Sequence, residues 1–206
     1  MALDLPPPDP GVEIVVATRG MSKGIAQTDG PQIVAKGFLR LEDVQFGLQW
    51  KNISSSSADG EGSAFLSTSR KLGSLQLSGS VAYKFYTGIR GNPDATSWEF
   101  TAAASRKFGP VTARLNAIFS PDDLGSARRS LFVEAGPAVQ LARGWTASAA
   151  IGQRSRVNGV DYTAFNGGIS KAAGPMQLDL RYYHTNRSGL DNPYRARIVA
   201  SARVSF

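Results

Sequence analysis

The sequence offers little for nucleophilic or acid–base catalysis. It contains one histidine, His184, and no cysteine, which excludes thiol nucleophiles, thiolate zinc sites and disulfides. Hydrolytic catalysis needs a base that is held by a carboxylate and placed beside a nucleophile, and the sequence gives His184 no such neighbours. We interpret His184 as a polar residue near the loop end of a strand, and we predict no catalytic residue, no enzyme activity and no cofactor.

Several carboxylates lie in stretches that also carry proline and glycine. Asp122 and Asp123 follow a proline, and Asp59, Glu61 and Asp94 lie in similar stretches. Such residues could form a calcium site or an acid–base pair, and the solvation of surface loops explains them equally well. No dense spacing of oxygen ligands of the EF-hand kind occurs, so we predict no metal site.

Positive charge is in excess, because 23 Lys and Arg residues against 16 Asp and Glu residues give a formal net charge of +7. The basic residues are spread singly instead of clustering with aromatic ones, so we predict no nucleic-acid partner. The glycine-rich segment 19–24 is not followed by a helix, as a phosphate-binding loop would be. We expect a turn-rich external loop there. The dispersed charge suits small anionic solutes or lipid phosphates better.

The elements that carry these residues alternate between apolar and polar side chains. In the segment 44–51, Val44, Phe46, Leu48 and Trp50 share one face, and polar residues or glycine occupy the other. The same period of two recurs along the chain, whereas helical spacing does not. It predicts twelve strands, near 11–19, 31–41, 43–52, 63–71, 74–86, 97–107, 110–119, 129–141, 144–154, 160–171, 175–184 and 194–206.

The connections between these strands alternate in length. Short turns are expected after Leu41, Leu72, Phe108, Ala142 and Ala173. Longer polar loops are expected at 20–30, 53–62, 87–96, 120–128, 155–159 and 185–193. Strands of about ten residues with this alternation are typical of an outer-membrane barrel, which has short periplasmic turns and longer extracellular loops. We predict an all-β fold, a transmembrane antiparallel β-barrel of about 12 strands; a soluble meander, sandwich or lipocalin-like barrel is the alternative.

Aromatic residues favour the membrane protein. In the expected strands they crowd the ends and leave mostly aliphatic residues in the middle of the outward face, as two interfacial belts around a hydrocarbon layer require. The interface aromatics are predicted to be Trp50, Phe85, Trp98, Phe108, Phe119, Trp145, Tyr162, Tyr182, Tyr194 and Phe206.

The inward face is where we expect function. The pore-lining residues are predicted to be Lys36, Arg40, Lys51, Lys84, Glu99, Arg114, Glu134, Asp179, Arg181, Arg195, Arg197 and Arg203. Excess positive charge in a narrow passage favours anions, so we predict a passive, weakly anion-preferring channel in which Arg114, Arg181 and Arg197 contribute most. A closed barrel with a structural or interaction role is the alternative, and a lipid-modifying or proteolytic barrel enzyme ranks last.

The chain resembles the TorF-like family of proteobacterial outer-membrane porins from Thr18 to Phe206. The resemblance rests on Arg19–Ser22 followed by Thr28–Gly30 and Gly37, and on Asp161–Thr163 followed by Gly168–Lys171. It implies a membrane barrel with a solute-diffusion role, and it transfers no substrate or catalytic residue. The last strand ends on Phe206, as outer-membrane proteins commonly do, which implies recognition by the barrel-assembly machinery.

These patterns together predict a lead-in and one domain. Residues 1–10 form a Pro-rich N-terminal lead-in and residues 11–206 the barrel, and we interpret Met1 as a start that replaces a removed signal peptide. We expect the protein in the outer membrane of a Gram-negative bacterium. Its expected partners are the lipid bilayer, lipopolysaccharide, small anionic or neutral solutes and the barrel-assembly machinery.

Overall fold

The computed structural model describes residues 7–125 and 128–206, and within them almost every ordered element is a β-strand. The strands are β1 (Asp9–Ala17), β2 (Met21–Ser22), β3 (Ile25–Ala26), β4 (Gln32–Leu41), β5 (Val44–Asn52), β6 (Gly60–Leu72), β7 (Leu75–Thr87), β8 (Thr96–Phe108), β9 (Val111–Ser120), β10 (Ser130–Ala142), β11 (Trp145–Arg156), β12 (Tyr162–Ala173), β13 (Met176–Thr185) and β14 (Arg197–Ser205). A single 3₁₀ turn, η1 (Asn192–Tyr194), precedes β14 in this described part. No helix among the described residues is long and apolar enough to cross a membrane.

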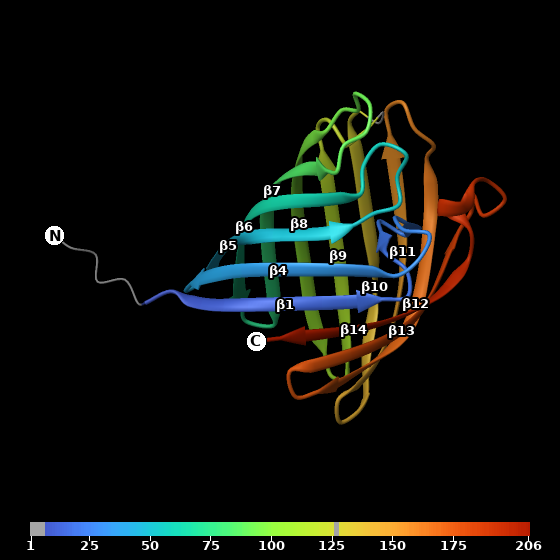
Figure 1. Cartoon of the computed structure of the whole chain (residues 1–206). Helices are drawn as coiled ribbons and strands as arrows, with labels where there is room; N and C mark the ends of the chain where they lie inside the picture. Colours follow the sequence, from blue (N-terminus) through green and yellow to red (C-terminus); the bar gives the residue numbers. More distant parts are fainter. Residues whose placement is uncertain (1–6, 126–127) are drawn as a thin grey trace.

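Strands β1 and β4–β14 form one closed antiparallel barrel of twelve strands among the described residues (Figure 1). Each strand pairs with its neighbours along the chain, and β1 closes the ring by pairing with both β4 and β14. At the closing pair, the backbone N–H groups of Val12 and Phe206 each donate to the carbonyl of the other, at 3.1 and 2.9 Å. The predicted fold class is confirmed.

Connection lengths alternate as the sequence predicted. Two residues separate β4 from β5, β6 from β7, β8 from β9, β10 from β11 and β12 from β13. Four of these five tight turns contain a glycine with positive φ, between 57° and 76° (Gly73, Gly109, Gly144 and Gly174), a region that residues with a Cβ atom rarely adopt. The other connections are longer and gather at the opposite end, so the barrel has a short-turn end and a long-loop end.

The structure departs from the predicted strands at both ends of the chain. Strand β1 begins at Asp9, inside the predicted lead-in, and residues 1–6 of that lead-in lie outside the described residues. The final strand begins at Arg197 and not at Tyr194, because Tyr194 belongs to the 3₁₀ turn and the N–H groups of Tyr194 and Arg195 donate to the carbonyls of Asp191 and Asn192. The chain also forms the short hairpin β2–β3, which the sequence did not predict.

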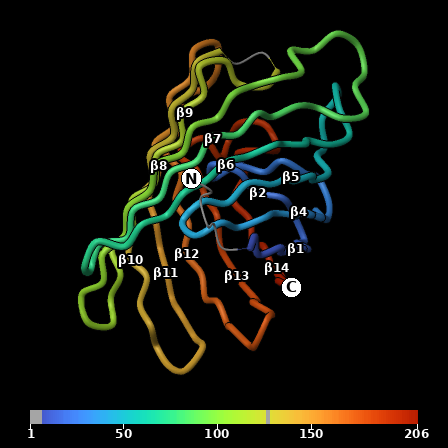
Figure 2. The backbone as a smooth tube through the Cα atoms, turned by 90° about the vertical axis from the view of Figure 1, so that its left-hand side faces the viewer, coloured from blue at the N-terminus to red at the C-terminus, as the bar shows by residue number. Residues whose placement is uncertain are grey.

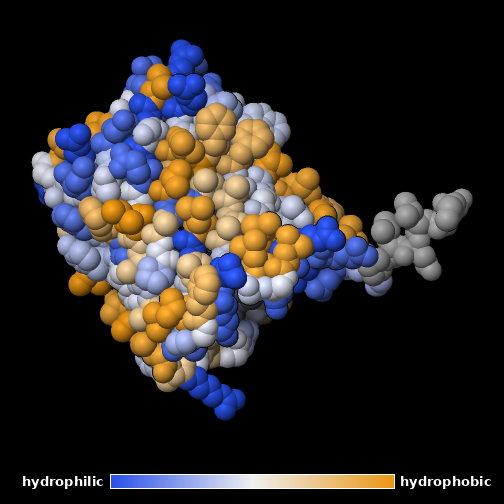
Figure 3. Space-filling model, turned by 180° about the vertical axis from the view of Figure 1, so that it is seen from behind, coloured by the Kyte–Doolittle hydropathy of each residue, from blue (hydrophilic) through white to orange (hydrophobic). Residues whose placement is uncertain are grey.

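The two faces of the wall differ as the alternation required. Leu48, Leu115, Leu180 and Ile198 point outward and are 65%, 49%, 57% and 68% exposed, which is unusual for large apolar residues in a protein that faces only water. Figure 3 shows apolar side chains over the body of the visible face and hydrophilic ones toward its ends. The outer surface is therefore suited to lipid.

Eight of the ten predicted interface aromatics lie on the outer face, and two do not. Tyr162 and Tyr194 are 1% and 9% exposed, and they pack against Phe132 and Ala164 inside the barrel. Their rings meet edge to face, with centroids 5.5 Å apart. The prediction was wrong for Tyr162 because β12 places Phe165, and not Tyr162, in its outward phase. It was wrong for Tyr194 because this residue precedes the strand.

The β10–β11 ladder is interrupted at Gly136 and Pro137 of β10. The pairing of β10 with β11 skips these two residues, since it passes from Ala135–Ile151 to Ala138–Ser148. A Cβ atom at position 136 would lie 2.0 Å from the carbonyl oxygen of Ala149 and 2.6 Å from the Cα atom of Ala150. Only glycine allows the two backbones to approach this closely.

We predict that Gly136→Val destabilises the barrel by about 1–3 kcal/mol, because the added atoms collide with backbone that cannot rotate away. The measurement is urea unfolding of the protein in lipid, followed by tryptophan fluorescence. Gly37→Val is the matched control: Gly37 lies on the outer face of β4, and an added Cβ meets nothing within 4 Å among the described atoms. Equal unfolding midpoints for the two variants would show that the close backbone approach at Gly136 does not require glycine.

Candidate functional site

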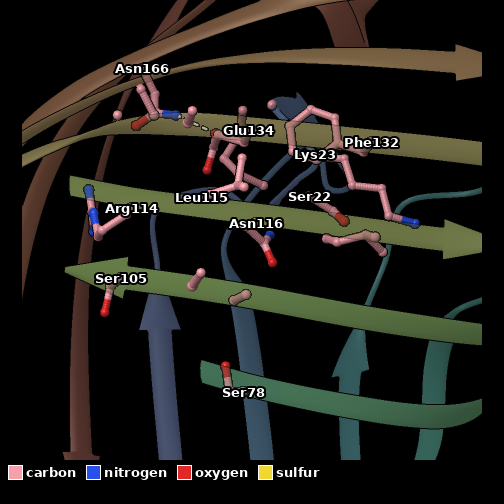
Figure 4. Close-up of a pocket in the computed structure, with 18 of the residues that line it drawn as sticks. Ser22, Lys23, Ser78, Ser105, Arg114, Leu115, Asn116, Phe132, Glu134 and Asn166 are labelled. Carbon is pink, nitrogen blue, oxygen red and sulfur yellow. Dashed lines mark hydrogen bonds between the residues drawn. The ribbon is translucent and has the colours of Figure 1, made fainter. Parts of the chain in front are cut away.

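The barrel encloses a central cavity of about 580 Å³. Its lining comes from strands β7–β13 and from the β2–β3 hairpin, and Figure 4 shows these side chains converging on one space. Among the described residues, its charged lining consists of three cations, Lys23, Arg114 and Arg181, and one carboxylate, Glu134. Serine, asparagine, glutamine and tyrosine side chains supply most of the remaining polar surface. This cavity is the candidate functional site.

The segment predicted as an external loop enters this cavity. Lys23 and Gly24 form the tip of the β2–β3 hairpin and have φ angles of 51° and 83°, as both central residues of a type I′ turn require. The base of the loop is closed because the N–H of Gln27 donates to the carbonyl of Gly20 at 2.8 Å. The N–H of Gly20 also donates to Oγ1 of Thr28 at 2.7 Å. The prediction of an external loop at 20–30 is therefore corrected.

The hairpin tip is held by contacts with the barrel wall. The Lys23 ammonium lies 2.7 Å from Oε2 of Glu99 on β8 and 4.0 Å from Oδ2 of Asp123 in the β9–β10 loop. The Tyr162 hydroxyl of β12 donates to the Lys23 carbonyl at 2.7 Å. On the other side of the tip, Gly24 packs directly on the methyl group of Ala164, where a Cβ atom would approach to 2.2 Å. Lys23 is almost completely enclosed, with 4% of its side chain exposed.

Lys23 belongs to a ladder of ion pairs that follows one wall of the lumen. Lys84 lies 3.0 Å from Glu61 and 3.3 Å from Glu99. Lys51 lies 3.2 Å from Glu61, which extends the ladder to β5. At its other end, Asp123 pairs with Arg154 of β11 and accepts a hydrogen bond from Ser130 at 2.9 Å. The ladder links five strands, the β2–β3 hairpin and the β9–β10 loop by charge pairing in a poorly solvated space.

Lys23 and Asp123, the two residues of this ladder that lie outside the barrel strands, have shifted pKa values. Burial lowers the pKa of the Lys23 ammonium below its ordinary value, with a contribution from Lys84, and the carboxylates of Glu99 and Asp123 offset this effect only in part. For Asp123, burial favours the neutral acid, but Lys23 and Arg154 outweigh it and hold the pKa of the carboxyl below its ordinary value. Asp123 is therefore ionised at neutral pH, whereas the charged form of Lys23 is costly to bury.

The opposite wall carries a smaller polar network. Arg181 of β13 donates to Asn166 at 2.9 Å and to Ser148 at 2.8 Å, and it pairs with Asp179 at 3.1 Å. Asn166 in turn donates to Glu134 at 2.9 Å. This arrangement fixes Arg181 in one orientation, so its charge is shared with its neighbours.

Arg114 of β9 differs from the other cations of the cavity. Within residues 7–125 and 128–206, its guanidinium has neither an ion-pair partner nor a hydrogen-bond acceptor, although the residue is exposed to the lumen. Figure 4 places Arg114 at the side of the cavity away from Lys23. An unshared positive charge in a confined aqueous space is the strongest local attraction for an anion.

The remaining predicted pore residues fall into three places. Lys36 faces inward over the ring of Phe65, 4.6 Å from its centroid, and Arg40 lies over Phe38 at 5.6 Å. Arg203 pairs with Glu13 at 3.6 Å near the short-turn end. Arg197 begins β14 at the long-loop end, where its side chain donates to the carbonyl of Asn192. Arg195 lies in the loop before β14, so it is not on a barrel strand.

Sequence reasoning missed three groups that shape the lumen: Lys23, Arg154 and the pair Tyr162–Tyr194. Arg154 occupies the inward phase of β11, so alternation alone could have identified it. Lys23 had a weaker signal, the Lys-Gly pair at the centre of a short turn. The two carboxylates assigned to loops, Glu61 and Asp123, prove to be ion-pair partners in the lumen, while Asp59 pairs with Arg90 outside it.

His184 lies on the outer face of β13 and not in the cavity. Its ring stacks on Tyr182 and Phe165, with centroid distances of 6.4 and 6.2 Å. Within the described part of the chain, no cluster of three His, Cys, Asp or Glu residues has metal-binding geometry.

The cavities form a sequence along the barrel. Gln76 lines the central cavity and also the two cavities at the short-turn end, of about 430 and 490 Å³. Ser22 and Lys23 line the central cavity and a smaller one of about 130 Å³ on the side of the long loops. The four cavities are therefore contiguous, and the one on the long-loop side of the hairpin tip has the smallest volume of the four.

Closure, the apolar outer face and the polar lumen define the class, a membrane-spanning antiparallel β-barrel. Solved structures similar to this chain include the KdgM porin, with a TM-score of 0.64 and 8% identity, covering 95% of this chain and 99% of that chain. The NanC porin is similar with a TM-score of 0.63 and 9% identity, covering 95% and 98%. A KdgM porin in complex with disordered oligogalacturonate is also similar, with a TM-score of 0.63, 8% identity and coverage of 95% and 99%.

At these identities the likeness concerns the fold, which is that of the porin barrels. No family model and no curated protein sequence matches the chain. The resemblance to the TorF-like family therefore stays a hypothesis.

We predict that Lys84→Met lowers the free energy of unfolding by about 3 kcal/mol or more, because it leaves Glu61 and Glu99 short of a buried counter-charge. Arg90→Met is the matched control, since the Arg90–Asp59 pair has side chains 51% and 67% exposed. An exposed pair contributes at most about 1 kcal/mol. Urea unfolding in lipid measures both variants. A loss for Lys84→Met no larger than that for Arg90→Met would show that the ladder does not support the barrel.

A second prediction concerns pH and Asp123. Because the folded pKa of this carboxyl is depressed, its contribution to stability is present above the unfolded pKa of about 3.9 and disappears as the pH falls through the lower folded value. Asp123→Asn should therefore be less stable than the wild type at pH 7, and the gap should close as the pH falls below about 4. Thermal unfolding in detergent at a series of pH values measures this, with the exposed neighbour Asp122→Asn as control. A gap that is independent of pH would refute the charge pairing.

Proposed function

We propose that the protein is an outer-membrane channel for the passive diffusion of small solutes. The long-loop end would face the exterior and the short-turn end the periplasm, as in barrels of this architecture. The exposed belt of Leu, Ile, Val and aromatic residues supports insertion in a bilayer. The similarity of the fold to the KdgM and NanC porins supports the same placement.

The single observation that carries this proposal is the polar lumen. A barrel that served only as a structural anchor could fill its interior with packed apolar side chains. Here the interior instead holds a cavity of about 580 Å³ lined by charged, amide and hydroxyl side chains, and shared lining residues connect it toward both ends. Such a lining replaces the hydration of a small polar solute.

We further propose a weak preference for anions, with small anionic or neutral solutes as cargo. Arg114 supports it, because its charge is unshared within the described residues, whereas Arg181 is neutralised by Asp179. The sequence-based expectation was that Arg114, Arg181 and Arg197 contribute most to selectivity, and the proposal now gives the largest contribution to Arg114. The KdgM porin, which shares the fold, was solved with oligogalacturonate, so a barrel of this kind accommodates a sugar chain.

The proposal includes two expected partners of the protein, the barrel-assembly machinery and lipopolysaccharide. Phe206 ends the chain beside β1 and is 75% exposed, which suits recognition of the last strand by the barrel-assembly machinery. The basic long-loop end, with Arg187 and Arg195 exposed, suits contact with the phosphates of lipopolysaccharide.

We predict that Arg114→Ser shifts the reversal potential in a salt gradient toward cations. A unit charge acting over about 8 Å at an effective dielectric constant near 40 changes the energy of a monovalent ion by about 1 kcal/mol, with opposite signs for anions and cations. The two effects combine to about 2 kcal/mol, so the anion-to-cation permeability ratio should fall by up to about thirty-fold. Planar-bilayer recording measures it.

Arg106→Ser is the control for this experiment, because it removes the same charge from the outer face, where the Arg106 guanidinium lies 5.1 Å from the ring centroid of Phe108. If Arg114→Ser leaves the reversal potential unchanged, Arg114 does not contribute to ion selectivity. A wild-type barrel that never conducts would favour the alternative of a closed barrel with a structural or interaction role.

A further inference from the structure

We propose that the β2–β3 hairpin, Met21–Ala26, is the size filter of the channel and that Lys23 is the positioning residue that holds it in the lumen. This inference rests on the proposed channel function. It assigns to one inserted segment the limit on solute size that the barrel itself does not impose.

The hairpin lies between a large and a small cavity of the lumen. Its residues Ser22 and Lys23 separate the central cavity, about 580 Å³, from the cavity of about 130 Å³ that Tyr86, Leu124 and Arg156 line on the long-loop side. Figure 4 shows Ser22 and Lys23 projecting into the central space from a chain segment that is not part of the surrounding wall. A solute that moves between the two cavities must pass this tip.

The barrel wall is complete without the hairpin. Strands β2 and β3 form a separate two-stranded sheet and pair only with each other among the described strands. Strands β1 and β4, which flank the loop in sequence, pair directly along nine residues. Figure 2 shows the early strands following one another around the wall. The position of the hairpin therefore depends on side-chain and tip contacts and not on the ladder of the barrel.

Charge pairing in the wall is also complete without Lys23. Among the described residues of the ladder, the cations Lys51, Lys84 and Arg154 stand against three carboxylates, Glu61, Glu99 and Asp123. Lys23 is a fourth cation, so the wall does not need it for neutrality. Its ammonium is nevertheless buried between two of these carboxylates, where it ties the hairpin tip to β8 and to the β9–β10 loop.

Ion pairing of Lys23 acts together with the packing of Ile25 on the buried cluster around Tyr162 to hold the hairpin in its docked position. The ammonium loses most of its hydration, and the two carboxylates compensate for this in part because Lys84 and Arg154 already share them. The other fixed contacts of the tip are the Tyr162–Lys23 carbonyl hydrogen bond and the packing of Gly24 on Ala164. A negative charge at position 23 would be repelled by Glu99 and Asp123 and would drive the hairpin out of the lumen.

The first test removes the hairpin. Residues 21–26 are replaced by Gly-Gly, which can close the loop because Gly20 and Gln27 are already joined by a 2.8 Å hydrogen bond. Single-channel conductance is recorded in planar bilayers, and the size limit is measured by liposome swelling with neutral saccharides from one to four units. We expect the conductance to rise about two-fold or more and larger saccharides to enter, with urea stability unchanged.

The second test keeps the hairpin and changes its charge. Lys23→Glu should shift the saccharide limit toward that of the deletion variant, whereas Lys23→Arg should retain the wild-type limit. Lys107→Glu is the matched control, because Lys107 lies at the short-turn end of the lumen, away from the hairpin. It should alter ion selectivity and leave the size limit unchanged, so a general effect of added negative charge can be recognised.

The outcomes separate this inference from the proposed function. Channels whose size limit is the same in the wild type, the deletion variant and Lys23→Glu would overturn the size filter and leave the channel function standing. A silent wild type with a conducting deletion variant would support the hairpin as the barrier. If neither the wild type nor the deletion variant conducts, both the channel function and the size filter are refuted.

Discussion

The lipid-facing surface imposes the constraint on which the structure depends: every backbone N–H and C=O group in the wall must be paired within the protein. A closed ring of strands satisfies this condition, and the β1–β14 pairing that ends at Val12 and Phe206 removes the last free edge. Closure then forces the side chains to alternate between lipid and lumen. The outward positions are limited to what a bilayer accepts, so the inward positions and the loops are where this protein acquires individual properties.

Within the lumen, paired and unpaired charges have different consequences. In the ladder from Lys51 to Arg154 every cation, Lys23 included, lies beside a carboxylate, so the ladder shapes the passage and much of its field is cancelled locally. Arg114 faces the same space without a counter-charge in the described part of the protein, so its field extends to a passing ion. A count of inward-facing charges therefore overestimates ion selectivity. Only the charges that lack a nearby counter-charge act strongly on a passing solute.

The sequence predicted the wall well, because a period of two over ten residues is a strong signal and each slip in register would turn a whole strand inside out. It predicted the contents of the lumen less well. Strands of two residues, such as β2 and β3, have no measurable period. Tyr162 and Phe165 place aromatic rings in both phases of β12, so alternation alone did not decide which ring faces lipid. Tyr194 and Lys23 are positioned by contacts with distant segments, and such contacts leave no local pattern.

The place of the hairpin in the chain has a consequence for the order of folding. Most strand pairs of the barrel join strands that are neighbours along the chain, and five of these pairs are connected by two-residue turns, so they can form early and locally. The hairpin follows the first strand, yet its tip contacts Glu99, Asp123, Tyr162 and Ala164, which belong to the middle and late parts of the chain. It has no surface to dock on until those strands have assembled. A newly closing barrel would therefore pass through a wide state before it becomes narrow, and its permeability would be lowest only at the end of maturation.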